Sequence, residues 1–293
     1  MTERSSKGPL SGYFRGKSIV VTGASSGIGA DCALAFGEQG ANVALLARRT
    51  APLEELAGRI IKAGGKALAL QCDVTDRARV FWAIEQARDA FGTIDILINS
   101  AGVLIPDAVE QLRPEDLERM MATNLYGAVN AMHAVLPIMR RKKAGNIVNV
   151  ASLAGRRGVS PLGGYSATKF ALVGLTEALR VELFGTGIHV SLVMPGVIDT
   201  PMARVAQMHA ESLKGMPTMM AMPVRWVTWA ILAAAAFGLT EVDVPPGAAV
   251  AEKLASLFPG VTDALMSVGS RILQGAGAMA SGAGASKPAG KQP

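Results

Sequence analysis

The chain has 293 residues, of which half are hydrophobic and 18% are charged, and its net charge is +6 at pH 7. This composition excludes an intrinsically disordered chain, and 33 glycines without a regular spacing exclude a collagen-like one. The basic residues are scattered along the chain rather than gathered in one segment, so we expect no nucleic-acid partner.

The cysteines and the N-terminal segment bear on the compartment. Cys32 and Cys72 are too few for a disulfide framework or a zinc site, so we expect a reducing compartment and no metal. Residues 1–15 contain no long apolar stretch, which predicts a flexible segment and argues against a secretory signal. The longest nearly apolar run, 226–239, is shorter than the roughly 20 residues that a membrane-spanning helix needs. We interpret that run as a buried helix and expect a cytoplasmic protein.

Apolar, β-branched runs alternate with helix-like patterns through most of the chain. In chain order, the predicted strands lie at residues 18–22, 42–47, 67–71, 94–99, 146–150 and 189–194. The predicted helices cover residues 32–39, 52–63, 77–91, 114–139 with an interruption or bend, and 165–183. This alternation indicates βαβ units, and the apolar strands indicate a sheet covered on both faces. The predicted fold class is therefore α/β, with a single Rossmann-like doubly wound parallel sheet over residues 16–247 and helices on both faces.

The pattern changes after Pro201. We predict a methionine-rich loop over residues 201–224, then the apolar helix and a last strand at 240–244. Residues 248–274 carry apolar side chains at helical spacing, which predicts a C-terminal helical extension. Two interpretations of the extension stay open: two short helices packed on the body, or a face that contacts a membrane surface or a partner. Residues 275–293 are rich in Gly and Ala, and we expect them to be disordered.

A glycine-rich turn follows the first predicted strand. Gly23, Gly27 and Gly29 allow a tight turn and a close approach of the backbone to a ligand. The helix that follows begins with unpaired N–H groups and the positive end of its dipole, which suit a pyrophosphate. A glycine-rich turn without a ligand is the alternative, but its place after the first strand of a βαβ chain favours nucleotide binding.

The end of the second predicted strand bears on which nicotinamide dinucleotide would bind. Sites for NAD usually place an acid there, which binds the ribose 2′-hydroxyl. This chain has Arg48 and Arg49 instead, and guanidinium groups bind phosphate. We therefore predict NADP(H) as the cofactor and NAD(H) as the less favoured one, with Arg48 as the main contact to the 2′-phosphate. A pair of solvated loop arginines is the alternative.

Three residues form a candidate catalytic group. Tyr165 and Lys169 are four residues apart on a predicted helix, which places both on one face. A nearby ammonium group favours phenolate, so we expect Lys169 to lower the pKa of Tyr165 and make it a proton donor and acceptor. Ser152 follows a predicted strand, where parallel sheets bind ligands, and its hydroxyl can orient a substrate oxygen. Tyr13 and Lys17 have the same spacing, but the pair has a glycine inside it and precedes the first strand, so we treat it as a decoy.

Together these motifs resemble the short-chain dehydrogenase/reductase (SDR) family over roughly residues 16–245. Residues 22–29 (TGASSGIG) are similar to the family's cofactor loop, and residues 195–200 (PGVIDT) to its segment beside nicotinamide. Residues 99–102 (NSAG) match the family's NNAG segment, except that Ser100 replaces the second Asn. The further matches are Asp73 for the adenine contact, Asn124 for the helix residue that holds a proton-relay water, and Ser152, Tyr165 and Lys169 for the catalytic positions.

The resemblance implies two sets of site residues. The catalytic set is Asn124, Ser152, Tyr165 and Lys169. The cofactor set is Gly23, Ser25, Ser26, Gly27, Ile28, Gly29, Arg48, Arg49, Asp73, Val74, Asn99, Ala101, Gly102, Tyr165, Lys169, Pro195, Gly196, Ile198 and Thr200. The implied activity is hydride transfer between NADP(H) and a carbonyl carbon or secondary alcohol, with Tyr165 exchanging the proton. A non-catalytic NADP-binding or scaffold protein of the same fold is the alternative, against which the intact catalytic set argues.

Assembly and substrate are predicted from the resemblance and from the methionines. Family members usually pair two long helices, so we expect a homodimer or homotetramer. The interface-like rows on these helices are Ala128, Ala131 and Val135, and Ala171, Leu175 and Leu179. Six of the 14 methionines lie in residues 202–222, and Met adapts to irregular apolar shapes. We expect a lid over a bulky, apolar, lipid-like ketone or alcohol; a Met-rich helix packed on the core is the alternative.

Overall fold

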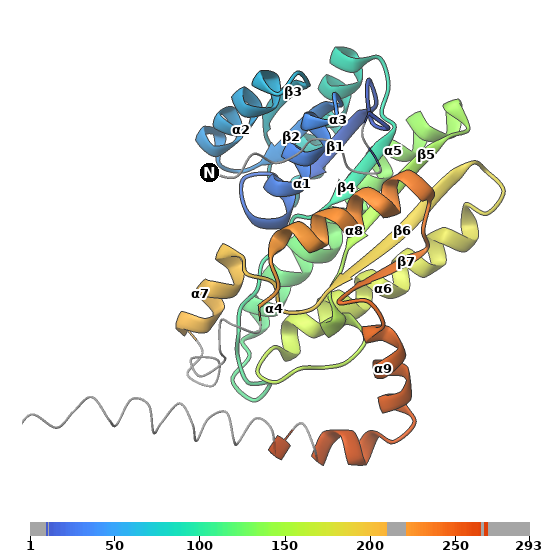
Figure 1. Ribbon diagram of the computed structural model, residues 1–293. Helices are drawn as coiled ribbons and strands as arrows, with labels where there is room; N and C mark the ends of the chain where they lie inside the picture. Colours follow the sequence, from blue (N-terminus) through green and yellow to red (C-terminus); the bar gives the residue numbers. More distant parts are fainter. Residues whose placement is uncertain (1–9, 11, 210–220, 265–266, 269–293) are drawn as a thin grey trace, which may run out of the picture.

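The computed structural model describes residues 10, 12–209, 221–264 and 267–268. Within these residues, seven parallel strands form one sheet in the order β3-β2-β1-β4-β5-β6-β7 (Figure 1). The strands are β1 (Ser18–Thr22), β2 (Asn42–Ala47), β3 (Lys66–Gln71), β4 (Ile96–Asn99), β5 (Gly145–Val150), β6 (Ile188–Pro195) and β7 (Glu241–Val244). The strand order reverses between β1 and β4, and open α/β sheets bind ligands at such a point, beyond the carboxyl ends of the strands.

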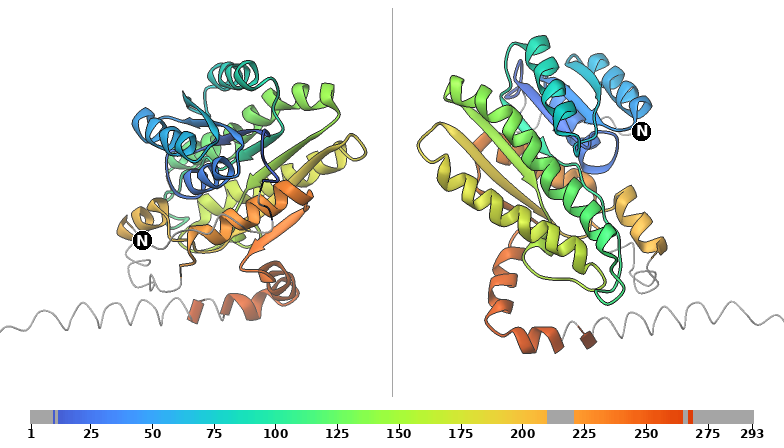
Figure 2. Two further views of the ribbon diagram at one scale, coloured as in Figure 1. Left: turned by 45° about the horizontal axis from the view of Figure 1, so that its top comes forward. Right: turned by 180° about the vertical axis from the view of Figure 1, so that it is seen from behind.

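Helices cover both faces of the sheet. They are α1 (Gly27–Glu38), α2 (Thr50–Lys62), α3 (Arg77–Phe91), α4 (Pro114–Met121), α5 (Gly127–Lys142), α6 (Gly163–Glu182), α7 (Pro201–His209), α8 (Val224–Phe237) and α9 (Ala248–Ser256). A π-helical turn, η1 (Ala122–Tyr126), and a 3-10 turn, η2 (Leu153–Gly155), complete the set. α1, α2 and α8 lie on one face, and α3, α5 and α6 lie on the other (Figure 2). The predicted doubly wound α/β fold is confirmed.

Successive side chains of a strand enter two separate cores. In β1, Ile19 and Val21 pack under α1, α2 and α8, whereas Val20 packs under α3, α5 and α6. All three side chains are fully buried. A strand that is buried on both faces has no polar side, which explains why its sequence is continuously apolar.

The largest differences from the predicted bounds lie at the start of α1 and at residues 201–209. α1 begins at Gly27, five residues before the predicted start at Cys32, because the glycine turn runs directly into the first helical turn. The interruption predicted within the helix over residues 114–139 is confirmed, because η1 divides it into α4 and α5, but α5 continues to Lys142. Residues 201–209, predicted as part of a loop, form α7, and the Thr200 hydroxyl accepts the N–H of Ala203 at 3.2 Å and caps it. Residues 210–220 of the predicted methionine-rich loop over the substrate lie outside the described residues.

Two residues of the N-terminal segment, Leu10 and Phe14, are buried in the core, whereas Tyr13 and Arg15 are exposed, and the flexibility of residues 1–15 stays a prediction. Phe14 is fully buried, and its ring lies edge-on to Phe36 with the two centroids 4.8 Å apart. The Tyr13 hydroxyl donates a hydrogen bond to the Ala236 carbonyl at 2.6 Å. Burial of an aromatic ring outweighs the polar character of its neighbours. The rest of the predicted flexible segment, 1–9 and 11, lies outside the described residues.

The apolar run predicted as a buried helix forms α8, but only one side of it is buried. Val227 and Ile231 are fully buried, whereas Trp226 and Trp229 are 48% and 49% exposed. The sheet lies on one side of the helix, so it can cover only one face. In the described part of the chain, no helix combines the length and the apolar character needed to cross a membrane.

One predicted interface row lies inside the protomer. Ala128, Ala131 and Val135 of α5 are buried in the core under the sheet. Their spacing of three or four residues marks the face of α5 that packs on the strands, so an interface on this row is excluded. On α6, Leu175 is exposed.

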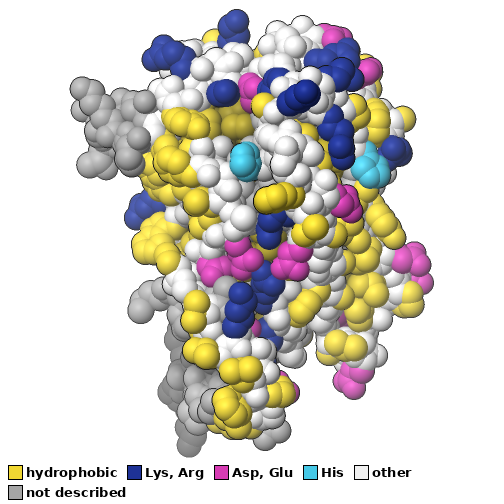
Figure 3. Space-filling view, turned by 90° about the vertical axis from the view of Figure 1, so that its right-hand side faces the viewer, with side chains coloured by type: hydrophobic (Ala, Val, Ile, Leu, Met, Phe, Trp, Pro, Cys, Tyr) yellow, Lys and Arg dark blue, Asp and Glu magenta, His cyan; other side chains and the backbone are white. Residues whose placement is uncertain are grey.

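The described part of the C-terminal extension is helical and lies at one end of the molecule, away from the sheet (Figures 1 and 2). Val250, Leu254 and Phe258 are each more than half exposed. Hydrophobic side chains accordingly gather at the lower end of the face in Figure 3. Asp263 of the extension forms an ion pair with Arg157 of the body at 2.5 Å. The extension therefore touches the body while these apolar side chains stay exposed, and both interpretations of it remain open. The predicted disordered tail, 275–293, lies outside the described residues.

Candidate active site

The turn between β1 and α1 is shaped by close backbone contacts. Gly23 has φ +71°, and a Cβ on it would lie 2.8 Å from the backbone of Ala101. A Cβ on Gly29 would lie 2.5 Å from the carbonyl oxygen of Gly23. The Thr22 hydroxyl oxygen accepts the N–H groups of Ser100 and Ala101, each at 3.2 Å, and so fixes the neighbouring loop. The sequence analysis placed Thr22 in the motif without assigning it this role.

The N-terminus of α1 is open to an anion. Ser26, its N-cap residue, has extended backbone angles and makes no side-chain capping hydrogen bond in the described structure. The first turn of α1 contains no acidic residue. Its first N–H groups and the positive end of the helix dipole therefore suit a phosphate group.

This turn opens into a cleft of about 300 Å³ beyond the carboxyl ends of the strands. The predicted residues that line it are Gly23, Ser25, Ser26, Gly27, Ile28, Arg48, Arg49, Asp73, Val74, Ala101, Gly102, Tyr165, Lys169 and Thr200. It is also lined by Ala47, Cys72, Ser100, Val103, Thr123, Val150, Ala151, Pro201 and Met202, which the sequence analysis did not select. Most of this second group lie at strand ends, where the sheet topology rather than a motif places them. The structure thus brings residues from well-separated segments to one edge of the sheet.

The other predicted residues stand outside this lining. They are Gly29, Asn99, Asn124, Ser152, Pro195, Gly196 and Ile198. Asn99 is buried and donates its Nδ2 to the Oδ1 of Asn149 at 2.9 Å, so its side chain joins β4 to β5. Ile198 is also buried and forms an isolated bridge with Met222. The side chains of Asn99 and Ile198 support the site from behind.

The ends of β2 and β3 place two cations and one anion on the cleft. Arg48 and Arg49 are both exposed. Arg49 donates hydrogen bonds to the carbonyl and hydroxyl oxygens of Ser25 at 3.4 and 3.1 Å, which ties it to the glycine-rich turn. The Asp73 carboxylate accepts the N–H and the hydroxyl of Thr75 at 3.0 and 2.9 Å, which orients it at the end of β3. This end of the cleft therefore offers positive charge for a phosphate and a carboxylate for a hydrogen-bond donor.

Tyr165 and Lys169 lie on the first turns of α6, beside the turn that begins at Ser152. The Ser152 hydroxyl is close enough to the Tyr165 phenol to act on its pKa as a hydrogen-bond partner, and it donates to the Pro195 carbonyl at 3.3 Å. The Nζ of Lys169 lies 5.7 Å from the centroid of the Tyr165 ring and donates to the Val150 carbonyl at 3.0 Å. The structure therefore brings the three predicted catalytic side chains together.

Burial sets the proton affinities of this pair. Desolvation raises the pKa of Tyr165 to about 12, and the hydrogen bond with Ser152 lowers it by less. Desolvation also lowers the pKa of Lys169 to about 8. The pKa of Tyr165 is therefore raised rather than lowered as expected, because desolvation dominates the shift. At neutral pH Tyr165 carries its proton and can donate it.

Asn124 lies in the π-helical turn η1 and connects two parts of the site. Its Oδ1 accepts the N–H of Val103 at 2.7 Å. Its Nδ2 donates to the Val103 carbonyl and to the Thr168 hydroxyl, both at 2.9 Å. Thr168 in turn donates to the Tyr165 carbonyl at 2.8 Å. Asn124 thus holds the loop after β4 against the helix that carries Tyr165. No sequence pattern marked Val103 or Thr168, because their partners are distant along the chain.

Comparisons with known proteins give one consistent result. A family profile described as short chain dehydrogenase matches residues 17–210. The ketoacyl reductase HetN of Nostoc sp. is 37% identical over 204 residues, which cover 69% of this chain and 71% of that protein. The 3-ketodihydrosphingosine reductase of Bacteroides thetaiotaomicron is 41% identical over 182 residues, which cover 62% of this chain and 64% of that protein. A solved short chain dehydrogenase/reductase from Burkholderia phymatum in complex with NAD has a TM-score of 0.77 and 25% identity, covering 85% of this chain and 95% of that one.

Proposed function

The chain belongs to the short chain dehydrogenase family of oxidoreductases, and on that premise we propose that it is an NADP(H)-dependent enzyme that interconverts an apolar ketone and its secondary alcohol. The observation that carries this proposal is the cluster of Ser152, Tyr165 and Lys169 beside the cleft. Both reductases named above take keto compounds according to their names, which supports a carbonyl substrate.

The cleft fits a nicotinamide dinucleotide by the chemistry of its lining. The open N-terminus of α1 would bind the pyrophosphate, and Asp73 and Val74, which line the cleft, would contact the adenine. Arg48 and Arg49 would bind a 2′-phosphate, which supports NADP(H) over NAD(H). When bound, this cofactor supplies or accepts the hydride, while the protein aligns it with the substrate.

The chain's own residues handle the proton. Tyr165, with a pKa of about 12, is protonated at neutral pH and donates to the substrate oxygen as negative charge develops there. Ser152 shares a hydrogen bond with Tyr165 and orients the same oxygen. Lys169, with a pKa of about 8, is mostly cationic at neutral pH and stabilises the phenolate that remains.

Apolar side chains near Ser152 support an apolar substrate. Gly196 lies close to two apolar side chains. A Cβ added to it would be 3.3 Å from a methyl group of Leu153 and 3.6 Å from the methyl group of Met222. Ala206 of α7 is buried against Leu104 and Leu162. This packing of α7 against loops beside the cleft supports a lid there. Met216, Met219 and Met220 of the predicted lid lie outside the described residues.

A ketone and alcohol screen tests the proposed function. Absorbance of NADPH would be followed with ketones and secondary alcohols of increasing length, using wild type and Tyr165→Phe. We expect turnover by the wild type, with preference for bulky apolar compounds, and turnover reduced at least about 100-fold in Tyr165→Phe. The variant should still bind NADPH, since only its proton donor is removed. Undiminished turnover by a folded Tyr165→Phe protein would refute the assignment of Tyr165.

A further inference from the structure

The turn that follows Ser152 is held by contacts that extend well beyond the cleft. Arg156 closes this turn, η2, by donating its N–H to the Leu153 carbonyl at 2.9 Å. A Cβ on Gly155 would lie 2.8 Å from the carbonyl oxygen of Lys169. The turn therefore lies directly against the backbone of α6 at Lys169, with no space between them.

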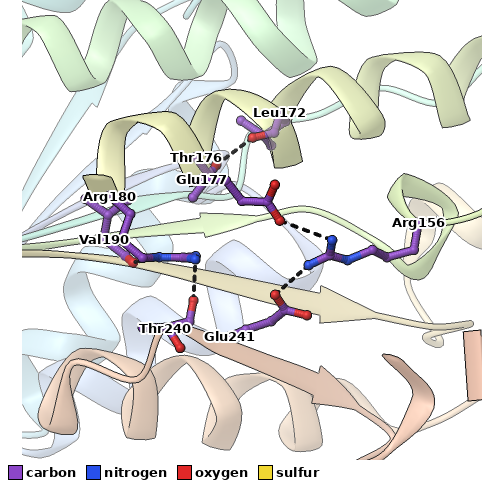
Figure 4. Close-up of polar contacts among 8 residues, drawn as sticks. All are labelled: Arg156, Leu172, Thr176, Glu177, Arg180, Val190, Thr240 and Glu241. Atoms are coloured by element: carbon purple, nitrogen blue, oxygen red, sulfur yellow. Dashed lines mark hydrogen bonds and ion pairs between the residues drawn. The ribbon is translucent and has the colours of Figure 1, made fainter. Parts of the chain in front are cut away.

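The Arg156 side chain connects this turn to two further elements (Figure 4). One Nη atom lies 3.1 Å from Oε1 of Glu177 in α6, and the other lies 2.5 Å from Oε2 of Glu241 in β7. The side chain is only 21% exposed, and its buried Nε has no hydrogen-bond partner among the described residues. A guanidinium group can bind two carboxylates at once because its donors have a fixed planar arrangement. Arg156 thus joins three segments that are distant in sequence.

We propose that Arg156 is a positioning residue, which holds Ser152 against Tyr165 by clamping η2 to α6 and β7. This inference rests on the proposed function, because Ser152 and Tyr165 must face one substrate oxygen for the clamp to affect turnover. An error of about 1 Å in such a geometry costs roughly 100-fold in rate. A surface ion pair that adds only stability would leave this geometry unchanged.

Arg180 provides a matched control on the same helix. Its Nε donates to the Val190 carbonyl at 3.1 Å, and an Nη donates to the Thr240 carbonyl at 2.8 Å (Figure 4). These bonds join α6 to β6 and to the start of β7, away from η2. Arg180→Gln therefore removes a guanidinium clamp from α6 without releasing the turn that follows Ser152.

The kinetic test compares Arg156→Gln, Arg156→Lys and Arg180→Gln. We expect Arg156→Gln to lower kcat roughly 10- to 100-fold, with KM and NADPH affinity within about twofold of wild type. Arg156→Lys should have a higher kcat than Arg156→Gln, because lysine keeps the positive charge. Its kcat should stay below that of wild type, because an ammonium group lacks the planar donors that bind both carboxylates. Arg180→Gln should keep kcat within about threefold of wild type. It should lower the Tm by about as much as Arg156→Gln does, because each variant loses one side-chain clamp on α6.

The pH profile gives a readout that a purely structural role would not move. The hydrogen bond from Ser152 lowers the pKa of Tyr165, so its loss should shift the alkaline rise of alcohol oxidation to higher pH in Arg156→Gln. The titratable groups that line the cleft with Tyr165 are Lys169, Cys72, Asp73, Arg48 and Arg49, and the variants alter none of them. Arg180→Gln should keep the wild-type profile.

Hydrogen–deuterium exchange tests the clamp without turnover. Amides of residues 153–157 should exchange at least about tenfold faster in Arg156→Gln than in wild type, and at the wild-type rate in Arg180→Gln. Equal exchange in the two variants, or an unchanged kcat and pH profile in Arg156→Gln, would overturn the proposal. If the wild type reduced no carbonyl compound, the proposed function would fail, and exchange alone would decide whether Arg156 fixes the turn.

Discussion

Desolvation moves the pKa values of the proposed catalytic pair, Tyr165 and Lys169, in opposite directions. Tyr165 rises to about 12 and Lys169 falls to about 8, because burial disfavours the charged form of each group. The i, i+4 spacing predicted their proximity, which depends on helix geometry alone. It did not predict the direction of the Tyr165 shift, because burial depends on segments distant in sequence.

Lys169 makes the folded state less stable at neutral pH. Its folded pKa of about 8 lies below the ordinary 10.5, so the unfolded chain binds more protons and stability rises with pH between these values. This shift corresponds to about 3 kcal/mol, and the hydrogen bond to Val150 offsets about 1 kcal/mol of it. We expect Lys169→Met to raise the free energy of unfolding by about 2 kcal/mol at pH 7.

Urea unfolding between pH 6 and 10.5 would measure this effect. The difference in the free energy of unfolding between Lys169→Met and wild type should be constant below about pH 8. It should decline between pH 8 and 10.5, because the wild type gains stability there. Exposed Lys62→Met is the control and should show no such dependence. A Lys169→Met variant that is less stable than wild type at pH 7 would contradict the assigned shift.

Arg48 should determine the choice of dinucleotide. Loss of a charge-assisted contact to the 2′-phosphate costs about 1.5–3 kcal/mol, or roughly 10- to 150-fold in affinity. Arg48→Ala should therefore weaken NADPH binding by that factor and leave NADH binding nearly unchanged. Arg49→Ala is the comparison, because Arg49 is already bonded to Ser25. Titration by fluorescence would measure both affinities, and an unchanged preference in Arg48→Ala would exclude it as the selector.

At the scale of elements, the sequence predicted the bounds of a helix or strand correctly where the signal lies within the element itself. The strand Asn42–Ala47 and the helix Arg77–Phe91 match their predicted bounds, because continuous apolar runs and a capped amphipathic segment are local signals. The sequence predicted an interruption of the long helix but not its π-helical form, and it did not predict α7. The formation of η1 and α7 depends on Asn124 bonding to Val103 and on Ala206 packing against Leu104 and Leu162, which are tertiary contacts.

Two helical glycines should respond oppositely to the same substitution. Gly29→Ala places a Cβ 2.5 Å from the Gly23 carbonyl oxygen, so we expect a loss of roughly 1–3 kcal/mol and weaker dinucleotide binding. Gly58→Ala in α2 meets nothing within 4 Å and should gain about 0.5–1 kcal/mol from helix propensity. Urea denaturation would measure both changes. If Gly29→Ala instead stabilised the protein, the turn between β1 and α1 would have moved to accommodate the Cβ, and the expected clash with Gly23 would be refuted.

At the scale of the whole molecule, we propose that the chain forms a homodimer or homotetramer through α6. Phe170, Leu175 and Val181 are exposed on this helix. Burial of apolar side chains of this size favours association with a second copy. The predicted α5 row is already used in the core, so we place the proposed interface on α6.

Light scattering at micromolar concentration would test the assembly. Wild type should be dimeric or tetrameric, and Phe170→Glu or Leu175→Glu should reduce its size, because a buried unpaired charge opposes association. Ile61→Glu on α2 changes an exposed apolar residue elsewhere and should leave the assembly intact. A monomeric wild type would refute the proposal, and an unchanged size of both α6 variants would exclude this interface.

Deuterium transfer tests the central claim most directly. The purified chain would be incubated with NADPH that carries two deuterium atoms at nicotinamide C4, together with a ketone identified in the screen. The account predicts an alcohol with deuterium on its carbinol carbon from the wild type, and almost none from Tyr165→Phe although that variant binds NADPH. An alcohol without deuterium, or equal product from Tyr165→Phe, would contradict it.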